Sequence, residues 1–261
     1  MGFNTITPTD ADSSIWGLKF FCLMNQLPVA KHYCKFYQEI ADKLADYINR
    51  HRVSWGIATY VQEDGINVFI NRPSLNASTW YEPHPCVTAN AWGVPQLRSS
   101  LEIDALEKNA VLAANTFWWS NPYFTDAFLL TGYEYGQEGG TKLRQYFQKR
   151  GEVLKQLKNS AKSVRYMCPV MLATMAYAHK AASELDATAK TLETLSTQQG
   201  DNGSWPGTSY LKVAYPSAEE SDRYFVGKKI EGGLVRDKSG LFSTAITVLI
   251  LCNLIQGELS C

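Results

Sequence analysis

The chain has 261 residues and a mass of 29.2 kDa, enough to bury one substantial core, and nothing in its composition marks a linker, so we expect a single domain over residues 1–261. Its 25 Lys and Arg residues balance 25 Asp and Glu residues, and this zero net charge excludes the basic surface that nucleic-acid binding requires. No apolar run reaches the roughly 18 residues of a membrane span and the N-terminus lacks a signal-peptide pattern, so we expect a soluble protein.

Cysteine usage favours a reducing compartment. None of the six cysteines forms a C-x-x-C pair, and several lie inside apolar runs, where a reduced thiol packs as a small hydrophobic group. They are Cys22, Cys34, Cys86, Cys168, Cys252 and Cys261. We therefore expect free thiols and a cytoplasmic location.

The first helix is expected over residues 11–24, which are apolar nearly all round and so predict burial on all sides. Asp10 and Asp12 lie at its start, and two interpretations are open for them. In the first, Asp10 caps the helix and Asp12 is a first-turn anion that the helix dipole satisfies. In the second, burial at the head of an apolar helix keeps Asp12 neutral, so that it can donate a proton.

The next helix, over residues 29–50, is apolar on one face. Its stripe consists of Tyr33, Phe36, Tyr37, Ile40, Leu44, Tyr47 and Ile48. Gly and Pro residues then keep residues 53–85 from forming one helix, so we expect a long loop there. Loops of this length in a compact domain usually have a task, such as closing over a pocket.

The rest of the chain repeats this alternation of two helix types. We expect apolar helices over residues 86–97, 122–133, 169–178 and 243–255, and one-faced helices over residues 100–114, 141–157 and 184–197. A second long loop is expected over residues 200–240, with short hairpin strands near residues 232–240.

The order of the helices predicts the fold class. A single layer of fully buried inner helices ringed by one-faced outer helices is an α/α toroid, whereas independent hairpins would not need the all-apolar class. The sequence therefore predicts an all-α toroid with alternating inner and outer helices. A complete toroid of six hairpins needs twelve helices, and we count about nine from periodicity, so the predicted ring is incomplete.

Residues 198–206 place Gln199, Gly203 and Trp205 at Gln-x-x-x-Gly-x-Trp spacing after the helix over residues 184–197. Gly203 can adopt the positive φ that ends a helix and turns the chain. The Gln199 amide can stack on the Trp205 indole and bond free N–H groups of the next helix. This arrangement is a structural staple and carries no chemistry by itself.

The staple resembles the QW motif of the squalene-hopene cyclase and class II terpene cyclase family, whose members carry prenyltransferase and squalene oxidase repeats. Residues 241–245 are similar to the closing inner helix of cyclase toroids, and residues 83–89 and 117–123 resemble the starts of inner helices. The likeness spans nearly the whole chain, more loosely from residue 130 to 165. It implies a terpenoid cyclase-like toroid that acts on an apolar, isoprenoid-like small molecule.

The segment from Thr9 to Trp16 resembles the D-x-D-D motif of these cyclases, in which the middle aspartate is the acid that protonates an alkene or epoxide. The resemblance implies that Asp12 is the catalytic acid and Asp10 its support. Ser13 departs from the motif and removes a carboxylate that would help hold the proton. To stay neutral at pH 7, an aspartate must raise its pKa by roughly three units from about 3.9, at a cost of about 4 kcal/mol, and only a water-poor site does this.

Aromatic residues gather at the starts of expected helices and in the loop over residues 53–85. A ring face stabilises a nearby cation by roughly 0.5–2 kcal/mol, although core packing is the alternative role for most of these rings. The candidate substrate-binding residues are Trp16, Trp118, Trp119, Tyr123 and His84. His84 lies between two prolines, where it either bonds an acid or a diphosphate or only stiffens the loop.

We expect no metal cofactor. Protein prenyltransferases share the toroid and bind zinc through Asp, Cys and His, but this sequence offers no such cluster. Mg²⁺ is needed only if the substrate is a diphosphate. Asp126, inside the apolar run 122–133, is interpreted as a helix-surface residue, with a second acid or a counterion as the alternative.

Two functions follow from these features. The first is a class II-type terpene cyclase, an isomerase or lyase of isoprenoid and natural-product biosynthesis, whose substrate and product the sequence does not give. The second is a non-catalytic toroid that binds or assembles with a partner. Residues 1–4 are similar to the Trp-Gly-Phe-Asn that follows a QW motif in longer relatives, as if the chain began midway. An open ring would expose apolar helix sides and call for a homo- or hetero-oligomeric partner.

Overall fold

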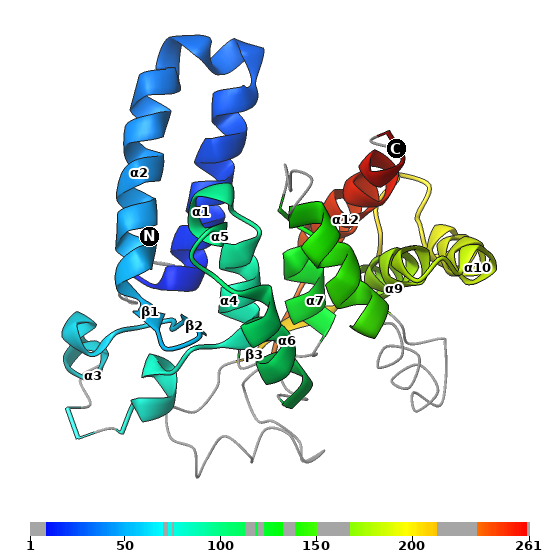
Figure 1. Ribbon diagram of the computed structural model, residues 1–261. Coiled ribbons are helices and arrows are strands. Elements are labelled where there is room, and N and C mark those ends of the chain that lie inside the picture. Colours follow the sequence, from blue (N-terminus) through cyan, green and yellow to red (C-terminus); the bar gives the residue numbers. More distant parts are fainter. Residues whose placement is uncertain are drawn as a thin grey trace.

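The computed structural model describes residues 9–69, 73–74, 76–112, 118–119, 123–132, 139–150, 168–212 and 234–259. Within them, a row of inner helices packs in chain order, each against the next (Figure 1). The row consists of α1 (Ala11–Gln26), α4 (Pro85–Trp92), α7 (Tyr123–Leu129), α9 (Pro169–Ala181) and α12 (Leu241–Leu259). Some sequence predictions concern residues outside the described part of the chain. They are the resemblance of residues 1–4 and the parts of the expected helices and helix starts that fall in residues 113–117 and 151–157.

Outer helices cover this row on one side. They are α2 (Cys34–Arg50) on α1, α6 (Ile103–Leu112) on α4, the helical residues 139–150 beside α7 and α9, and α10 (Leu185–Ser196) on α9. Figure 1 shows α2 and α10 at opposite ends of the molecule. The predicted all-α, toroid-like arrangement of inner and outer helices is confirmed.

Short elements connect the helices. They are η1 (Pro28–Tyr33), β1 (Arg52–Val53), β2 (Gly56–Ile57), η2 (Gln62–Asp64), α3 (Ile66–Phe69), η3 (Ser78–Tyr81), α5 (Pro95–Arg98), β3 (Ser209–Lys212) and β4 (Leu234–Arg236). Two antiparallel pairs form, with Arg52 opposite Ile57 in β1–β2 and Lys212 opposite Leu234 in β3–β4. Only one strand, β4, lies where the short hairpin near residues 232–240 was expected, and its partner β3 lies at residues 209–212, so the expected local hairpin is replaced by a pairing of two distant segments.

The inner helices differ in how completely they are buried. Every residue of α4 and α7 is buried, as predicted, and so is nearly all of α9. The end members of the row behave otherwise, since Phe20 on α1 is 54% exposed and Ile255 on α12 is 57% exposed. The prediction of burial on all sides is wrong for α1 and α12, because among the described helices each packs against an inner helix on one side of the row. Their exposed apolar faces are those expected at the ends of an incomplete ring.

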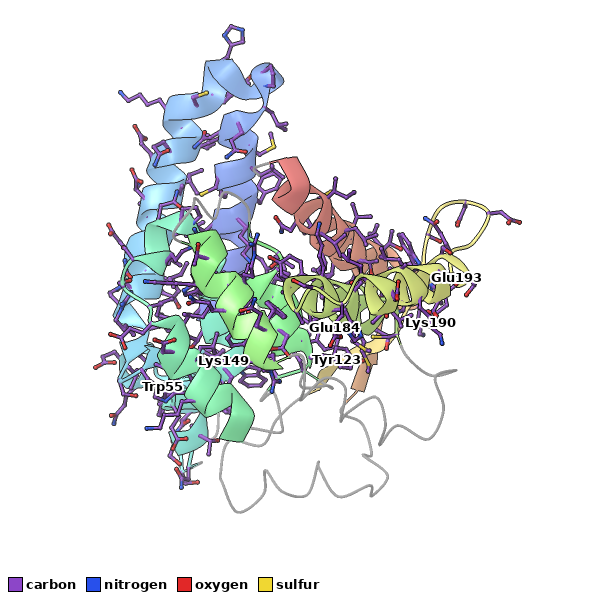
Figure 2. All side chains as sticks on the ribbon, turned by 45° about the vertical axis from the view of Figure 1, so that its right-hand side comes forward. Trp55, Tyr123, Lys149, Glu184, Lys190 and Glu193 are labelled. Carbon is purple, nitrogen blue, oxygen red and sulfur yellow. The ribbon has the colours of Figure 1, made fainter. Side chains whose placement is uncertain are left out.

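Two outer helices bury the predicted face along most of their length, with Ile48 and Leu195 in the core, but expose it at one end. Tyr33 and Phe36 are exposed because they lie at the tip of the α1–α2 hairpin, which extends beyond the other helices (Figure 1). On α10, Leu185 is exposed, whereas Thr188 and Thr191 are buried and donate their hydroxyl groups to carbonyls one turn earlier. The exposed Lys190 and Glu193 of α10 point to solvent (Figure 2).

The helix predicted over residues 86–97 is divided into α4 and α5 at Gly93 and Val94. Two glycine backbones cross there, because a Cβ on Gly132 would lie 2.3 Å from the carbonyl oxygen of Gly93. This close approach brings the ends of α4 and α7 together beside the middle of α1.

The staple joins the end of α10 to the start of α12. The Trp205 indole N–H donates to the Leu195 carbonyl at 2.9 Å, and its backbone N–H donates to Thr244 Oγ1 at 2.9 Å. Gly203 has the expected positive φ of 79°. The predicted place of Gln199 on the last turn of the helix is wrong, because α10 ends at Ser196; the Gln199 amide donates to the Gly203 carbonyl at 2.8 Å. Gln199 therefore closes the turn that presents Trp205.

The five cysteines in the described residues are free thiols, as predicted. None of the described helices is long and apolar enough to cross a membrane.

Candidate active site

Asp10 caps the first inner helix. Its Oδ1 accepts the backbone N–H of Ser13 at 2.7 Å, and its backbone carbonyl accepts the Ser14 hydroxyl at 2.6 Å. Burial raises the pKa of Asp10, while the bonds from Ser13 oppose the rise. The cap interpretation of Asp10 is confirmed, and Ser13, which stands where the family motif has a carboxylate, contributes its backbone to that cap.

Asp12, two residues on, turns away from its own helix toward α4. Its Oδ1 accepts the side-chain amide of Asn90 at 3.0 Å. Burial raises the pKa of Asp12 to about 7; the Asn90 bond, the charge of Lys19 and the Trp119 indole N–H lower it, and Asp10 adds to the rise. The residue as a whole is partly exposed. Asp12 is therefore a largely buried carboxyl group that can hold a proton near neutral pH.

A buried lysine continues this network. Lys19 Nζ donates to Asn90 Oδ1 at 2.6 Å and to Thr131 Oγ1 at 2.7 Å, and it lies 4.7 Å from the ring centroid of Trp16. Burial lowers the pKa of Lys19 to about 7, while the negative charge of Asp12 opposes the fall. These hydrogen bonds link α1, α4 and Thr131, which follows the end of α7.

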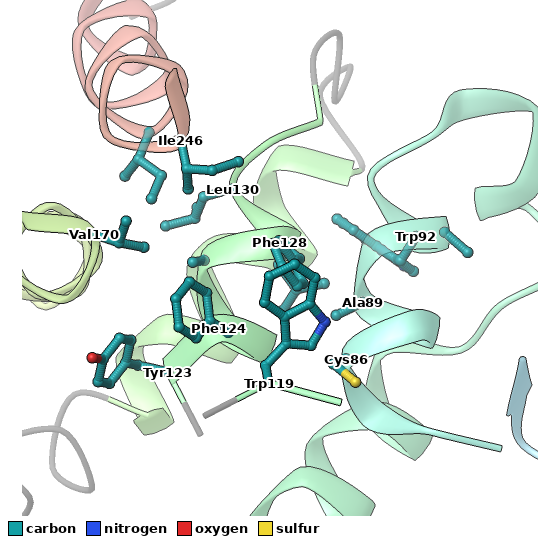
Figure 3. Close-up of a cluster of buried hydrophobic side chains, with 14 of the residues drawn as sticks. Cys86, Ala89, Trp92, Trp119, Tyr123, Phe124, Phe128, Leu130, Val170 and Ile246 are labelled. Atoms are coloured by element: carbon teal, nitrogen blue, oxygen red, sulfur yellow. The ribbon is translucent and has the colours of Figure 1, made fainter. Parts of the chain in front are cut away.

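Aromatic rings form a wall beside Asp12. Trp119 contacts Phe128 with a centroid distance of 4.5 Å and stacks on Phe242 at 5.6 Å with an interplanar angle of 13°. Trp16 meets the same Phe128 edge-to-face at 5.5 Å. Figure 3 shows Trp119 between α7 and α4, with Phe124 and Phe128 on one side. Two of the predicted aromatic residues, Trp16 and Trp119, thus come together at the acid.

Trp118 faces a separate cluster. Its indole N–H donates to Thr59 Oγ1 at 2.5 Å, and that hydroxyl bonds His84 Nδ1 at 2.9 Å. His84 Nε2 donates to the Thr79 carbonyl at 2.8 Å, and burial lowers the pKa of His84 to about 4. The imidazole is therefore neutral and occupied by structural bonds. Trp118 also packs against Tyr60 and Trp80.

Tyr123 adjoins the aromatic wall through Phe124, which contacts Trp119 at a centroid distance of 5.2 Å. Its hydroxyl contacts the Cys168 thiol at 3.0 Å, and its ring packs on Phe124 inside the core (Figure 3). Trp119 and Tyr123 are thus joined through Phe124, whereas Trp118 packs against Tyr60, Trp80 and His84.

Sequence reasoning missed Lys19 and Asn90. Lys19 is the only basic residue of the apolar helix α1 and Asn90 the only amide of α4, which is the signal that could have marked them. Lys19 follows Asp12 by seven positions, two helical turns, and so lies on the same face of α1.

The remaining candidate sites hold no part of this network. In the described residues, no three His, Cys, Asp or Glu side chains gather as a metal site would require. An open hollow of about 710 Å³ lies beside the staple, between Trp205 and Asp237, and is lined mostly by backbone and small side chains.

Comparisons with known proteins support the fold. No protein-family model matches the chain, and no curated protein sequence matches it. The type II terpene cyclase MstE from Scytonema, without ligand, aligns with 98% of this chain and 77% of its own, with a TM-score of 0.63 and 20% identity. An MstE variant with an aspartate-to-asparagine substitution, in complex with its substrate geranylgeranyl dihydroxybenzoate, covers 98% and 76% with a TM-score of 0.66 and 21% identity. A complex with the product merosterolic acid A has a TM-score of 0.62, with 21% identity over 97% and 75% of the chains. This chain has a type II terpene cyclase-like fold.

Proposed function

We propose that this chain is a class II-type terpene cyclase in which Asp12 protonates an isoprenoid substrate. The observation that carries the proposal is the environment of Asp12, which is partly exposed, is bonded by a neutral amide and has its pKa raised to about 7 by burial. A carboxylic acid that is neutral near pH 7 is the group required to protonate an alkene or epoxide.

The proton transfer balances with the groups present. The substrate π bond takes the proton from the Asp12 hydroxyl, which leaves a carboxylate on the protein and a carbocation on the substrate. The Asn90 amide, which donates to Asp12 Oδ1, stabilises the carboxylate. It supports the proposal because it supplies, from α4, a hydrogen bond to the acid that Ser13 does not.

The aromatic wall suits the cation that forms. Ring faces stabilise a cation and offer no lone pair to capture it, unlike a hydroxyl or carboxylate. Trp16 and Trp119 both contact Phe128 next to the acid, so we assign these three residues to the early carbocation.

The substrate class follows the structural neighbours. MstE binds geranylgeranyl dihydroxybenzoate as substrate, so a polyprenyl chain on an aromatic acid is the first probe to use. Such a substrate has no diphosphate, and we expect turnover to survive EDTA. A substrate that carries a diphosphate would instead make turnover depend on Mg²⁺.

The test is Asp12→Asn, which keeps the shape of the side chain and removes the transferable proton. We expect turnover of geranylgeranyl dihydroxybenzoate, followed by mass spectrometry of the cyclised products, to fall by about three orders of magnitude or more. Asp186→Asn is the matched control, because Asp186 is an exposed first-turn aspartate on α10. Wild-type turnover by Asp12→Asn would overturn the proposal.

One observation favours the alternative, a non-catalytic toroid that assembles with a second copy. Phe20, Leu23, Tyr33 and Phe36 are exposed at the tip of the α1–α2 hairpin. A chain that binds polyprenyl substrates without turning them over, and that scatters light as a dimer until Phe20→Ser and Phe36→Ser are introduced, would favour this alternative.

A further inference from the structure

Lys19 occupies a position that a lysine rarely takes. It is 7% exposed in the middle of an apolar inner helix, and its ammonium lies beside the crossing of Gly93 and Gly132. A Cβ on Gly93 would come within 3.1 Å of Lys19 Nζ, so the glycine leaves the room that the ammonium uses.

The chemistry of lysine fixes the orientation of its neighbour. A lysine ammonium has three hydrogens to donate and cannot accept. Lys19 is protonated below its pKa of about 7, and in that form the Asn90 side chain, 2.6 Å from Lys19 Nζ, must present its oxygen. The NH₂ group of Asn90 then faces Asp12 and donates to Oδ1 at 3.0 Å.

The hydrogen bonds from Lys19 through Thr131 run in the same donor-to-acceptor direction. Thr131 Oγ1 accepts from Lys19, so its own hydrogen is available for the Phe128 carbonyl, which lies 2.8 Å away. Both chains of hydrogen bonds therefore start at Lys19 and run away from it. Asp12 ends one of them as an acceptor.

We propose that Lys19 is a positioning residue that locks the amide of Asn90 and, through it, leaves Oδ2 as the oxygen of Asp12 that carries the proton. The oxygen that accepts from Asn90 is the carbonyl oxygen of the neutral acid, because a carbonyl oxygen is a stronger hydrogen-bond acceptor than a hydroxyl oxygen. The catalytic meaning of this assignment rests on the proposed function, whereas the locked amide itself does not.

The charged groups around Asp12 and Lys19 determine whether removal of Lys19 raises or lowers the pKa of Asp12. Asp12 is faced by Lys19 and by Asp10 from its own helix, while α4 and the chain before α7 contribute the uncharged Asn90 amide and Trp119 indole. Lys19 is faced by Asp12 and by Arg98 from α5. Removal of Lys19 takes away a positive charge and also lets the Asn90 amide turn and accept the proton of Asp12. Both changes favour the neutral acid, so the pKa of Asp12 should rise.

The experiment measures Asp12 directly, without substrate. Carboxyl ¹³C NMR of aspartate-labelled protein, with the Asp12 signal assigned from Asp12→Asn, should show a rise of about one pH unit in the Asp12 midpoint on Lys19→Met. In an Asn90→Leu background the same substitution should shift the midpoint by less than half as much. An equal shift in both backgrounds would mean that Lys19 acts by charge alone and would overturn the proposal, as would no shift in either.

Lys180→Met is the matched control. Lys180 is a partly buried lysine on α9 that donates to the Leu254 carbonyl, so it loses a comparable hydrogen bond away from the acid. It should leave the Asp12 midpoint unchanged. If Lys19→Met does not fold, Lys19→Gln serves in its place, because an amide can accept as well as donate and so no longer fixes Asn90.

Turnover separates this proposal from the proposed function. Lys19→Met should lower kcat about tenfold at neutral pH with KM unchanged, and the fall of activity with rising pH should move to higher pH together with the NMR midpoint. If Lys19→Met gives the expected NMR shifts but the wild-type protein does not turn over the substrate, the proposed function is overturned and the role of Lys19 in fixing the Asn90 amide stands. Suppose instead that turnover depends on Asp12, but Lys19→Met changes neither the NMR midpoint of Asp12 nor kcat. This result would overturn the proposal that Lys19 fixes the Asn90 amide and would leave the proposed function standing.

Discussion

Two aspartates enclosed by the inner helices, Asp12 on α1 and Asp126 on α7, have opposite kinds of partner. Asp126 is fully buried and receives two bonds from the Arg150 guanidinium, at 3.1 and 3.0 Å, and one from the Tyr146 hydroxyl at 2.7 Å. Asp12 receives a neutral amide, and the nearest cation, Lys19, reaches it only through that amide.

The difference shows that burial raises the free energy of a charged carboxylate, and that its hydrogen-bond partner determines whether this cost is compensated. A bidentate guanidinium compensates the carboxylate of Asp126, which therefore anchors the helix over residues 139–150 to α7 as an ion pair. Asp12 lacks such a partner, so burial raises its pKa toward neutrality. The prediction that Asp126 is a helix-surface residue is wrong, because the outer helix covers it.

The largest expected effect tests the ion pair. Arg150→Met removes the guanidinium and leaves Asp126 buried without its cation, so we expect the free energy of unfolding in urea to fall by about 3–5 kcal/mol. The double variant Asp126→Leu with Arg150→Met should recover most of the loss. A loss below about 1 kcal/mol in Arg150→Met would break the comparison, since the partner would then not be what distinguishes the two sites.

The staple provides a control whose expected loss of unfolding free energy is similar to that of Arg150→Met but involves neither Asp12 nor Asp126. Trp205→Ala removes a buried indole that bonds the Leu195 carbonyl, and we expect it to lower the free energy of unfolding by about 3 kcal/mol. The loss should be the same at pH 5 and pH 8, as no titratable group bonds the indole. A loss under about 0.5 kcal/mol would identify Trp205 as an ordinary loop residue.

Asp12 should instead make stability depend on pH. Its pKa rises from 3.8 when unfolded to about 7 when folded, so the folded chain holds a proton that the unfolded chain releases. The favourable contribution is fully present below pH 4 and is lost as the pH rises to about 7, on the order of 2–4 kcal/mol in all. Lys19, with its pKa lowered from 10.5 to about 7, acts oppositely and adds stability as the pH rises from 7 to 10.5.

Urea unfolding of the wild type and Asp12→Asn across pH 4–8 measures this contribution. The wild type should lose stability relative to the variant as the pH rises through this range. Parallel curves for the two proteins would mean that the Asp12 carboxyl is solvated in the folded state, which would remove the contrast with Asp126.

The smallest expected effect concerns the cap next to the acid. Asp10→Ala removes the acceptor for the Ser13 N–H and should cost about 1 kcal/mol in thermal or urea unfolding. Asp10→Asn keeps an acceptor and should cost only a few tenths of that. Turnover should fall far less in Asp10→Asn than in Asp12→Asn, and equal losses would show that the two aspartates act as one unit.

The sequence by itself determined the layers of this protein. Periodicity separated the all-apolar helices over residues 86–97, 122–133 and 169–178 from their one-faced neighbours, and the spacing of Gly203 and Trp205 located the staple. These features are local: a helix repeats its pattern within a few turns, and a glycine that needs positive φ acts on its own turn. The same local rules found the Asp10 cap from its place before an apolar helix.

Only the tertiary structure decided what each buried polar group meets. Asp12 and Asn90 are 78 positions apart, and Asp126 and Arg150 are 24 apart, so no periodicity within one helix could pair them. The exposed faces of α1 and α12 likewise depend on their places at the ends of the row. Burial and partners come from packing between distant segments, and they set whether a carboxyl group is a cap, an ion pair or an acid.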